Sequence, residues 1–261
     1  MTEEVGAQVN LRDLGGLDAG GGRVLRHGLL IRSEALPRFS QADLEDLGER
    51  GIKLVCDLRA PSESVGVSMP WSPAHERPQM LALPIWGDEG PEVPFSRSEA
   101  GSEAGFRAVL TAVYRTMPRA LDRTGGLATL VDRIMAGHTP VLIHCSQGKD
   151  RTGVIVALLL AACGADWDTI VEDYLLTNDF YDKGLASRQT AAALTGPGEE
   201  VAELDPGTAR ALDASLGYLE ATWEEIGVEY GSLDEYLRGA AGLGPERRRE
   251  FRELLTEPRP G

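Results

Sequence analysis

One cysteine of this sequence lies where a nucleophile could act on an anion. Cys145 ends the apolar run VLIHC, and a short polar stretch, SQGKD, separates it from Arg151 and a second apolar run. Helix N-termini and nearby cations favour the thiolate form of a cysteine, which is its reactive form. Arginine presents a planar fork of N–H donors that matches two phosphate oxygens. The spacing therefore predicts attack by Cys145 on a phosphate held by Arg151.

The loop between the two apolar runs has the composition of an anion cradle. A strand ending at Cys145 and a helix beginning near Arg151 would bring the intervening backbone N–H groups to one point. The dipole of that helix further favours negative charge there. Gly148 lets the backbone turn with positive φ and lets the anion approach closely. The residues predicted to bind phosphate are Ser146, Gln147, Gly148, Lys149, Asp150 and Arg151.

The residues on either side of this loop are predicted to support the nucleophile. We expect His144 to orient the loop through its ring nitrogens, because a thiolate needs no separate base. Thr152 is expected to hydrogen-bond the sulfur and to help it leave when water hydrolyses the thiophosphate. An inert cysteine beside a surface arginine would leave the polar stretch SQGKD unexplained.

The leaving group needs a proton, and three aspartates compete to supply it. Asp150 lies within the loop. Asp57 ends an apolar run, and the carboxyl ends of parallel strands share one crevice, although this residue could instead pair with Arg59 or Arg12. Asp88 lies in the Gly- and Pro-containing segment WGDEGP. We favour Asp150 over Asp57, and place Asp88 third.

Alternating strands and helices are predicted to position these residues. The apolar runs Ile52 to Leu58, Met80 to Ile85 and Thr139 to Cys145 predict strands. Residues 21–33 predict a hairpin or two short strands. Residues 40–51 open with a serine cap and end at glycine, which predicts a short helix. Strands separated by helices imply a mostly parallel sheet.

Helical periodicity dominates the rest of the chain, and residues 86–102 and 195–207 are expected to be loops. We therefore predict one α/β domain over residues 1–261, with a central, mostly parallel sheet of four to five strands flanked by helices. The predicted helices cover residues 106–117, 127–137, 152–163, 167–178 and 208–226, and a last helical segment opens with a capping box at residues 232–235.

Composition excludes several classes of protein. The net charge of -15 disfavours a nucleic-acid or anionic-membrane surface, and the longest apolar run, Gly153 to Cys163, is too short to span a bilayer. Four histidines without metal-ligand spacing predict no metal site. Three cysteines without paired spacing indicate a reduced, cytoplasmic protein. Of these, Cys56 is interpreted as an apolar core residue, the alternative being a disulfide with oxidised Cys145.

Several motifs together resemble a known family. The loop HCSQGKDRTG resembles the signature loop of the cysteine-dependent protein tyrosine phosphatase superfamily, in the version typical of its bacterial tyrosine/serine, atypical dual-specificity and lipid-phosphatase-like branch. The resemblance extends over most of the chain. Further matching segments are NLRDLGG, LIRSEAL, GIKLVCDLR, EDYLLTN and YGSLDEYL.

The resemblance implies phosphomonoester hydrolysis through a cysteinyl-phosphate, without metal or other cofactor. In related phosphoinositide phosphatases a loop aspartate at the place of Asp150 is the acid, and a loop lysine like Lys149 binds an extra phosphate. Lys149 could instead merely steady the loop. We expect a phosphorylated protein as substrate. The alternatives are a phosphosugar, a nucleotide or a phosphoinositide, and, last, a phosphate-binding protein without activity.

Overall fold

A five-stranded sheet forms the centre of the molecule. The computed structural model describes residues 9–66, 69–93, 100–195, 201 and 203–260. The strand order is β1-β3-β6-β4-β5; β1 runs antiparallel to β3 and the other neighbouring pairs are parallel. The predicted mostly parallel sheet is therefore confirmed. The strands are β1 (Arg12–Asp13), β3 (Leu30–Ser33), β6 (Val141–His144), β4 (Leu54–Asp57) and β5 (Gln79–Ala82).

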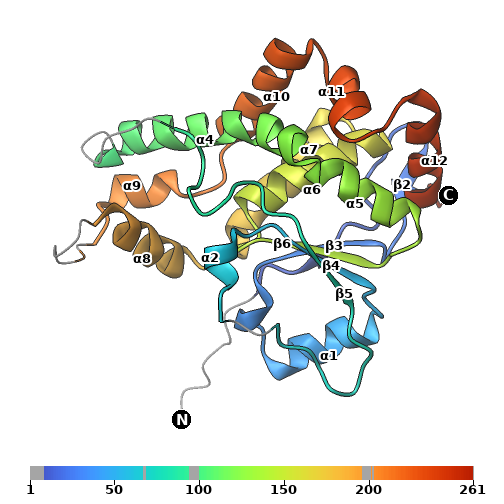
Figure 1. The fold of residues 1–261 in the computed structure, drawn as a ribbon, viewed down its shortest axis with the longest axis horizontal. Coiled ribbons are helices and arrows are strands. Elements are labelled where there is room, and N and C mark those ends of the chain that lie inside the picture. Colours follow the sequence, from blue (N-terminus) through green and yellow to red (C-terminus); the bar gives the residue numbers. More distant parts are fainter. Residues whose placement is uncertain (1–8, 67–68, 94–99, 196–200, 202, 261) are drawn as a thin grey trace.

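Helices cover both faces of this sheet (Figure 1). Side chains alternate along β6, so Val141 and Ile143 join the larger core cluster while Leu142 joins the smaller one. The smaller cluster lies under α1 (Gln41–Glu49), whose capping box at Ser40 confirms the predicted helix start. The larger cluster lies on the other face, around α6 (Asp150–Cys163), whose residues from Thr152 to Cys163 are all buried.

The other helices form the layers around α6 and the active-site end of the sheet. Helix α10 packs along α4, and both lie on the same side of the sheet as α6 (Figure 1). The helices other than α1 and α6 are α2 (Pro61–Ser64), α4 (Glu103–Thr124), α5 (Gly126–Met135), α7 (Trp167–Leu176), α8 (Lys183–Leu194), α9 (Pro206–Ala211), α10 (Leu216–Tyr230), α11 (Leu233–Ala240) and α12 (Pro245–Leu255).

The helical region after α7 differs from the prediction. The single helix expected over residues 208–226 is wrong, because the chain leaves the helix between α9 and α10, where Asn178 binds both the N–H and the carbonyl of Ala214. Helix α8 was not predicted, since its alanine-rich sequence lacks an apolar stripe. Parts of the two expected loops, residues 94–99, 196–200 and 202, lie outside the described residues.

A second, two-stranded sheet joins distant parts of the chain. Residues 21–33 do contain two short strands, but β2 (Arg23–Leu25) pairs with β7 (Thr256–Pro258) and not with β3. The alternative of a hairpin is thus wrong. The Arg23 guanidinium strengthens the pairing by donating to the hydroxyl and carbonyl oxygens of Thr256.

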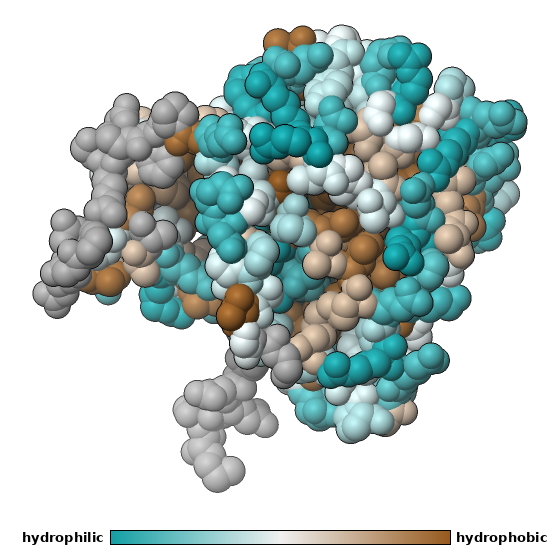
Figure 2. All heavy atoms as spheres, viewed as in Figure 1, coloured by the Kyte–Doolittle hydropathy of each residue, from teal (hydrophilic) through white to brown (hydrophobic). Residues whose placement is uncertain are grey.

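The surface mixes hydrophilic and hydrophobic side chains. Hydrophilic side chains cover most of the face drawn in Figure 2, and hydrophobic ones appear between them in smaller patches. No helix in the described part of the chain is both long and apolar enough to cross a membrane.

Candidate active site

The end of β6 carries the predicted nucleophile to the carboxyl edge of the sheet. Cys145 follows β6 directly and is 3% exposed. The strand register places His144 opposite both Asp57 of β4 and Ser33 of β3, so three strands end at this edge. Helix α6 begins at Asp150, one residue earlier than the position expected from sequence. The predicted strand, loop and helix therefore lie in the order an anion cradle needs.

The carbonyl oxygens of the loop point to partners outside it. The Ser146 carbonyl accepts from Ala35 N–H at 3.2 Å, and Asn10 Nδ2 donates to the carbonyls of Gln147 and Gly148 at 3.0 and 3.3 Å. Because the C=O and N–H of a peptide unit point in opposite directions, these contacts turn the corresponding N–H groups away from those partners. The backbone can then offer donors to an anion.

Gly148 has the positive φ predicted for it, at 66°. A Cβ at this position would approach the carbonyl oxygen of Ser33 to 2.4 Å. The close approach of the loop to β3 therefore requires glycine for space as well as for conformation.

A buried ion cluster braces the loop from behind. Arg32 on β3 is fully buried and donates to Asp173 Oδ2 at 2.5 Å and to the Gly148 carbonyl at 2.8 Å. Arg12 donates to Asp173 Oδ1 at 2.9 Å. Burial alone would raise the pKa of Asp173, but the two guanidinium groups lower it, so this carboxylate stays charged and anchors both arginines.

Arg151 is paired with a residue that the sequence did not indicate. Its NH1 and NH2 donate to the two carboxylate oxygens of Glu63 at 2.5 and 2.8 Å, and the Ser146 hydroxyl donates to the same carboxylate at 2.5 Å. Burial alone would lower the pKa of Arg151, but Glu63 and the charges of Cys145 and Asp150 raise it. The same contacts lower the pKa of Glu63 to about 2, against the effect of its own burial.

A cavity of about 820 Å³ opens above the cysteine; we call it the active-site cavity. Its wall contains the loop on one side and α8 on the other, and Gln147 donates to Gln189 of α8 at 2.8 Å. A polar end beside an apolar wall suits an ester with an anionic head and an apolar body. The cavity is lined by Glu63, Phe106, Cys145, Ser146, Gln147, Lys149, Asp150, Arg151, Ala186, Gln189, Thr190, Leu194 and Leu212.

Of the three candidate acids, Asp150 is the one that lines the active-site cavity. Its Oδ1 accepts a hydrogen bond of 2.6 Å from the hydroxyl of Tyr114 on α4. That hydroxyl also lies 2.8 Å from the hydroxyl of Tyr174 on α7. The first turn of α6 is thus linked to two neighbouring helices through one carboxylate.

Asp57 is engaged by its neighbour Arg59. The guanidinium of Arg59 donates to both carboxylate oxygens, at 2.7 to 3.1 Å. Burial would raise the pKa of Asp57, but Arg59 and the nearby His144 lower it. Asp57 is absent from the cavity lining, so the arrangement corresponds to the alternative prediction of a pair with Arg59.

Asp88 has a bracing position. Its Oδ1 accepts from the N–H of Ser62 at 2.7 Å, at the start of α2. Glu63 also belongs to α2, so this bond helps to fix the carboxylate that faces Arg151. Asp88 itself is absent from the lining of the cavity.

Lys149 points into packed structure. Its side chain is 5% exposed, its ammonium group donates to the carbonyl of Leu212 and lies 5.0 Å from the centre of the Tyr181 ring. The ammonium is also 3.6 Å from Asp150 Oδ2. These contacts favour the interpretation that Lys149 steadies the loop against the helices around Leu212.

The two supporting residues are both buried. His144 Nδ1 donates to the Cys145 carbonyl at 3.1 Å, and burial lowers the pKa of the ring, which suits orientation of the loop by a neutral imidazole. Thr152 Oγ1 has no hydrogen-bond partner among the described residues, so its bond to the sulfur stays a prediction. Cys56 is fully buried, and burial raises the pKa of its thiol, in keeping with a core residue.

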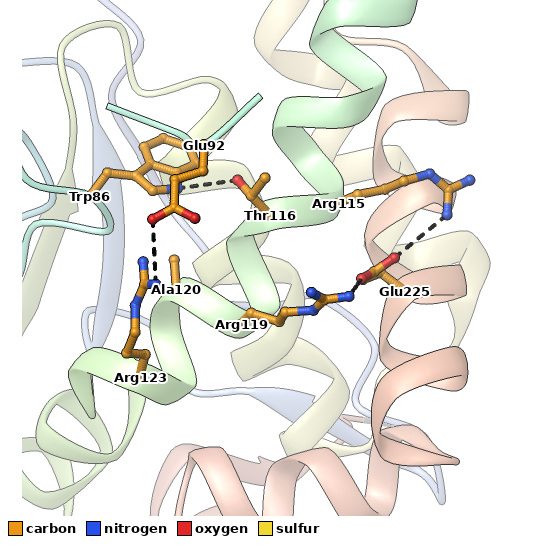
Figure 3. A pocket seen from close by; sticks show the side chains of 8 residues that line it. All are labelled: Trp86, Glu92, Arg115, Thr116, Arg119, Ala120, Arg123 and Glu225. Carbon is orange, nitrogen blue, oxygen red and sulfur yellow. Dashed lines mark hydrogen bonds and ion pairs between the residues drawn. The ribbon is translucent and has the colours of Figure 1, made fainter. Parts of the chain in front are cut away.

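A second hollow, of about 220 Å³, lies between α4 and α10 (Figure 3). Arg115 and Arg119 point from α4 toward Glu225 of α10, and Arg123 points toward Glu92. We call this the α4–α10 hollow. Neither a cysteine nor a histidine lines it. Elsewhere too, the described residues contain no group of three or more His, Cys, Asp or Glu side chains that could hold a metal ion.

An α/β sheet that ends in a cysteine and a tight loop, with an arginine in the first turn of the next helix, is typical of the cysteine-dependent phosphatases. Residues 4–257 match the model of the tyrosine phosphatase family. The chain belongs to this family, as the loop HCSQGKDRTG led us to expect.

Curated relatives span most of the chain. It is 36% identical over 234 residues to a putative tyrosine-protein phosphatase of Cupriavidus necator, covering 88% of this chain and 81% of the relative. It is 34% identical over 241 residues to the triple specificity protein phosphatase PtpB of Mycobacterium tuberculosis, covering 83% and 87% respectively. The phosphatase class predicted from the sequence is confirmed.

Solved structures give a weaker likeness. A complex of a TpbA variant of P. aeruginosa with phosphotyrosine matches with a TM-score of 0.31 and 15% identity, covering 66% of this chain and 80% of the other. A second TpbA structure matches with a TM-score of 0.28, covering 85% and 99%. At these scores the likeness carries no argument about the site.

Glu63, Tyr114 and Arg32 are among the residues of the site that were not predicted. Glu63 lies 88 residues from Arg151 in the sequence, and Tyr114 lies 36 residues from Asp150. A short sequence motif cannot show that residues so far apart in the chain are in contact. Two signals were present, since a charged residue in a strand and a tyrosine within an apolar helical stripe both need buried polar partners.

Proposed function

We propose that this protein hydrolyses aryl phosphate esters, phosphotyrosine in proteins above all, through a cysteinyl-phosphate on Cys145. The observation that carries the proposal is the active-site cavity, which joins Cys145 and Arg151 at one end to the apolar side chains of Phe106, Leu194 and Leu212. The names of the two curated relatives support a tyrosine phosphatase activity and, for PtpB, a broader specificity.

The first step transfers the phosphoryl group to sulfur. The Cys145 thiolate forms the S–P bond while the ester P–O bond breaks, and its electron pair goes to the leaving oxygen. Asp150 gives that oxygen a proton. Arg151 and the loop N–H groups hold the equatorial oxygens, whose charge develops where donors are already oriented.

The second step regenerates the enzyme. Asp150 takes a proton from water, the water oxygen bonds to phosphorus, and the S–P bond breaks to return the thiolate and release phosphate. Thr152 stabilises the departing sulfur by its hydroxyl. Each residue then ends the cycle in its starting protonation state.

The contacts of Lys149 favour phosphotyrosine over a phosphoinositide as substrate. A second phosphate would need a cation free to meet it, but the ammonium of Lys149 is already bound to the Leu212 carbonyl and lies over Tyr181. We therefore assign Lys149 to steadying the loop, and rank small phosphates and phosphoinositides below phosphotyrosine as substrates.

Two further parts of the proposal concern the chain as a whole. We propose that residues 1–261 act as one phosphatase domain. The pairing of β2, near the start of the chain, with β7, near its end, supports this proposal. The three free cysteines support a reducing, cytoplasmic setting.

The test compares substrates in the presence of EDTA. We expect turnover of p-nitrophenyl phosphate and of phosphotyrosine peptides that resists EDTA, is inhibited by vanadate and disappears in Cys145→Ser. Phosphoserine peptides, phosphoinositides and sugar phosphates should react more slowly. Cys163→Ala, a buried cysteine away from the cavity, is the matched control. Turnover that survives Cys145→Ser, or no turnover at all, would contradict the proposal.

A further inference from the structure

Tyr114 is a buried tyrosine whose hydroxyl reaches the active site from α4. The side chain is fully buried, and its ring stacks on Tyr218 with centroids 5.4 Å apart. The hydroxyl lies 2.6 Å from Asp150 Oδ1, in the first turn of α6. A hydrogen bond this short joins a helix of the outer layer directly to a carboxylate that lines the active-site cavity.

The direction of the hydrogen bonds follows from the chemistry of the groups. Oδ1 has no proton to give, whether Asp150 is ionised or carries its proton on Oδ2, so Tyr114 donates to Asp150 and Tyr174 must donate to Tyr114 across their 2.8 Å contact. Burial, followed by the charge of Asp150, raises the pKa of Tyr114 well above its ordinary value, and burial raises that of Tyr174. Both hydroxyls therefore keep their protons through the working pH range.

The two oxygens of Asp150 thus have different surroundings. Oδ1 is held by Tyr114, whereas Oδ2 accepts no hydrogen bond in the described part of the chain and lies 3.6 Å from the Lys149 ammonium. A carboxyl group fixed through one oxygen carries its transferable proton on the other.

We infer that Tyr114 is a positioning residue for proton transfer: it holds Asp150 Oδ1 so that Oδ2 faces the leaving oxygen. This inference rests on the proposed role of Asp150 as the general acid. Tyr174 supports it one step further away, by fixing the hydroxyl of Tyr114. The pair extends the active site into α4 and α7, two helices whose sequences contain no catalytic motif.

The substitution Tyr114→Phe removes this hydroxyl and keeps the ring that stacks on Tyr218. The loss of activity should be largest for substrates whose leaving oxygen needs a proton from the acid. We expect kcat/KM, which reports the step that releases the alcohol, to fall about tenfold for an alkyl phosphate and to change less than about twofold for p-nitrophenyl phosphate. An equal loss on both substrates would overturn the inference, because misfolding or loop damage acts on both.

Tyr236→Phe is the matched control. Tyr236 is also fully buried, and its hydroxyl donates to a carbonyl of α4, that of Pro118, at 3.2 Å. Its loss should leave the ratio of alkyl to aryl kcat/KM unchanged. If Tyr236→Phe lowers this ratio as much as Tyr114→Phe does, the effect belongs to helix packing and the inference fails.

Asp150→Asn separates this inference from the proposed function. If the ratio falls in Asp150→Asn, Tyr114→Phe should lower it no further in that background, and a further fall overturns the inference. If Asp150→Asn keeps the wild-type ratio, the acid assignment fails and the inference with it, while Cys145-dependent turnover stands. A normal ratio in Tyr114→Phe alone overturns only the role of Tyr114.

The readout remains usable if Tyr114→Phe folds poorly. A ratio of two kcat/KM values from one preparation does not depend on the folded fraction. Tyr174→Phe offers a milder change, because it leaves the bond between Tyr114 and Asp150 in place. It should lower the same ratio by about twofold to threefold, and an unchanged ratio would count against the inference.

Discussion

The active-site cavity and the α4–α10 hollow both contain arginines paired with glutamates. Arg151 meets Glu63 at 2.5 Å, and Arg119 meets Glu225 at 2.7 Å (Figure 3). The surroundings differ. Arg151 is 17% exposed, opens a helix and stands beside a cysteine and a backbone loop, whereas Arg119 is 59% exposed in the middle of a helix.

The difference shows what makes an anion site out of an arginine. In the α4–α10 hollow, the charge of each arginine is matched by glutamates on α10 or near Trp86, and no backbone donors are added. In the active-site cavity, one glutamate meets one arginine, while the loop N–H groups and the start of α6 remain for a ligand. A cluster of arginines is thus less informative than one arginine beside oriented N–H groups.

The largest effect is expected when Arg151 is replaced by lysine, and the same change at Arg119 serves as the comparison. Arg151→Lys should lower kcat/KM for p-nitrophenyl phosphate by about 10³-fold, because a point charge cannot replace the bidentate fork. Arg119→Lys should leave kcat/KM within about twofold, since a surface ion pair does not act on the substrate. Similar losses of kcat/KM in the two variants would remove the distinction between the active-site cavity and the α4–α10 hollow.

The next largest effect tests the space behind the loop. Gly148→Ala should lower kcat/KM by about 10²-fold, because its Cβ would meet the Ser33 carbonyl and shift the cradle. Gly51→Ala is the control, with a similar φ of 65° and no atom within 4 Å. It should cost about 1–2 kcal/mol of stability in urea unfolding and keep full activity. Equal activity in both variants would show that the contact with β3 is unimportant.

Glu63 provides a third test, because its carboxylate is bound to the Arg151 guanidinium, which we propose binds the phosphate. Glu63→Gln should strengthen competitive inhibition by inorganic phosphate roughly threefold to tenfold, since a carboxylate no longer competes with phosphate for the Arg151 guanidinium. Weaker phosphate inhibition together with a lower kcat would instead mean that Glu63 serves mainly to hold Arg151.

The pH dependence of stability should also change in this variant. The pKa of Glu63 is about 2 in the folded protein, compared with an ordinary value of 4.5. Its pairing therefore stabilises the fold above pH 4.5 and is lost as the pH falls toward 2. Urea unfolding should show a smaller loss of stability in Glu63→Gln than in wild type over this range, and an equal loss would contradict the assignment.

The smallest effect concerns the α4–α10 hollow. Arg119→Ala should change the free energy of unfolding by no more than about 1 kcal/mol, because exposed ion pairs are screened by water and salt. The difference from wild type should shrink as NaCl is added, as measured by urea unfolding at two salt concentrations. A larger, salt-independent loss would indicate that this hollow is part of the core.

The sequence predicts much of this site because its central loop is local. Cys145, Gly148 and Arg151 lie within seven consecutive residues between a strand and a helix, and the structure places them as that pattern requires. The parallel sheet follows from apolar runs separated by helices in the same way.

The remainder depends on packing between distant segments. Glu63 reaches Arg151 only because Asp88 holds the start of α2, and Tyr114 reaches Asp150 only because α4 lies against α6. The sequence favoured Asp150 over Asp57 but could not exclude Asp57, since both lie at the expected edge of the sheet. The bonds from Arg59 to Asp57 distinguish the two carboxylates.

The outward hydrogen bonds of the loop carbonyls also affect when conformational entropy is lost. Asn10, Arg32 and the N–H of Ala35 fix the peptide units of residues 146–148 during folding. A ligand that enters the cradle then finds its donors already oriented, and association loses little further chain entropy. The N–H of Ala35, which donates to the Ser146 carbonyl, should accordingly exchange slowly before ligand is added. The shape of the phosphate site is thus inherited from the fold and not made by the substrate.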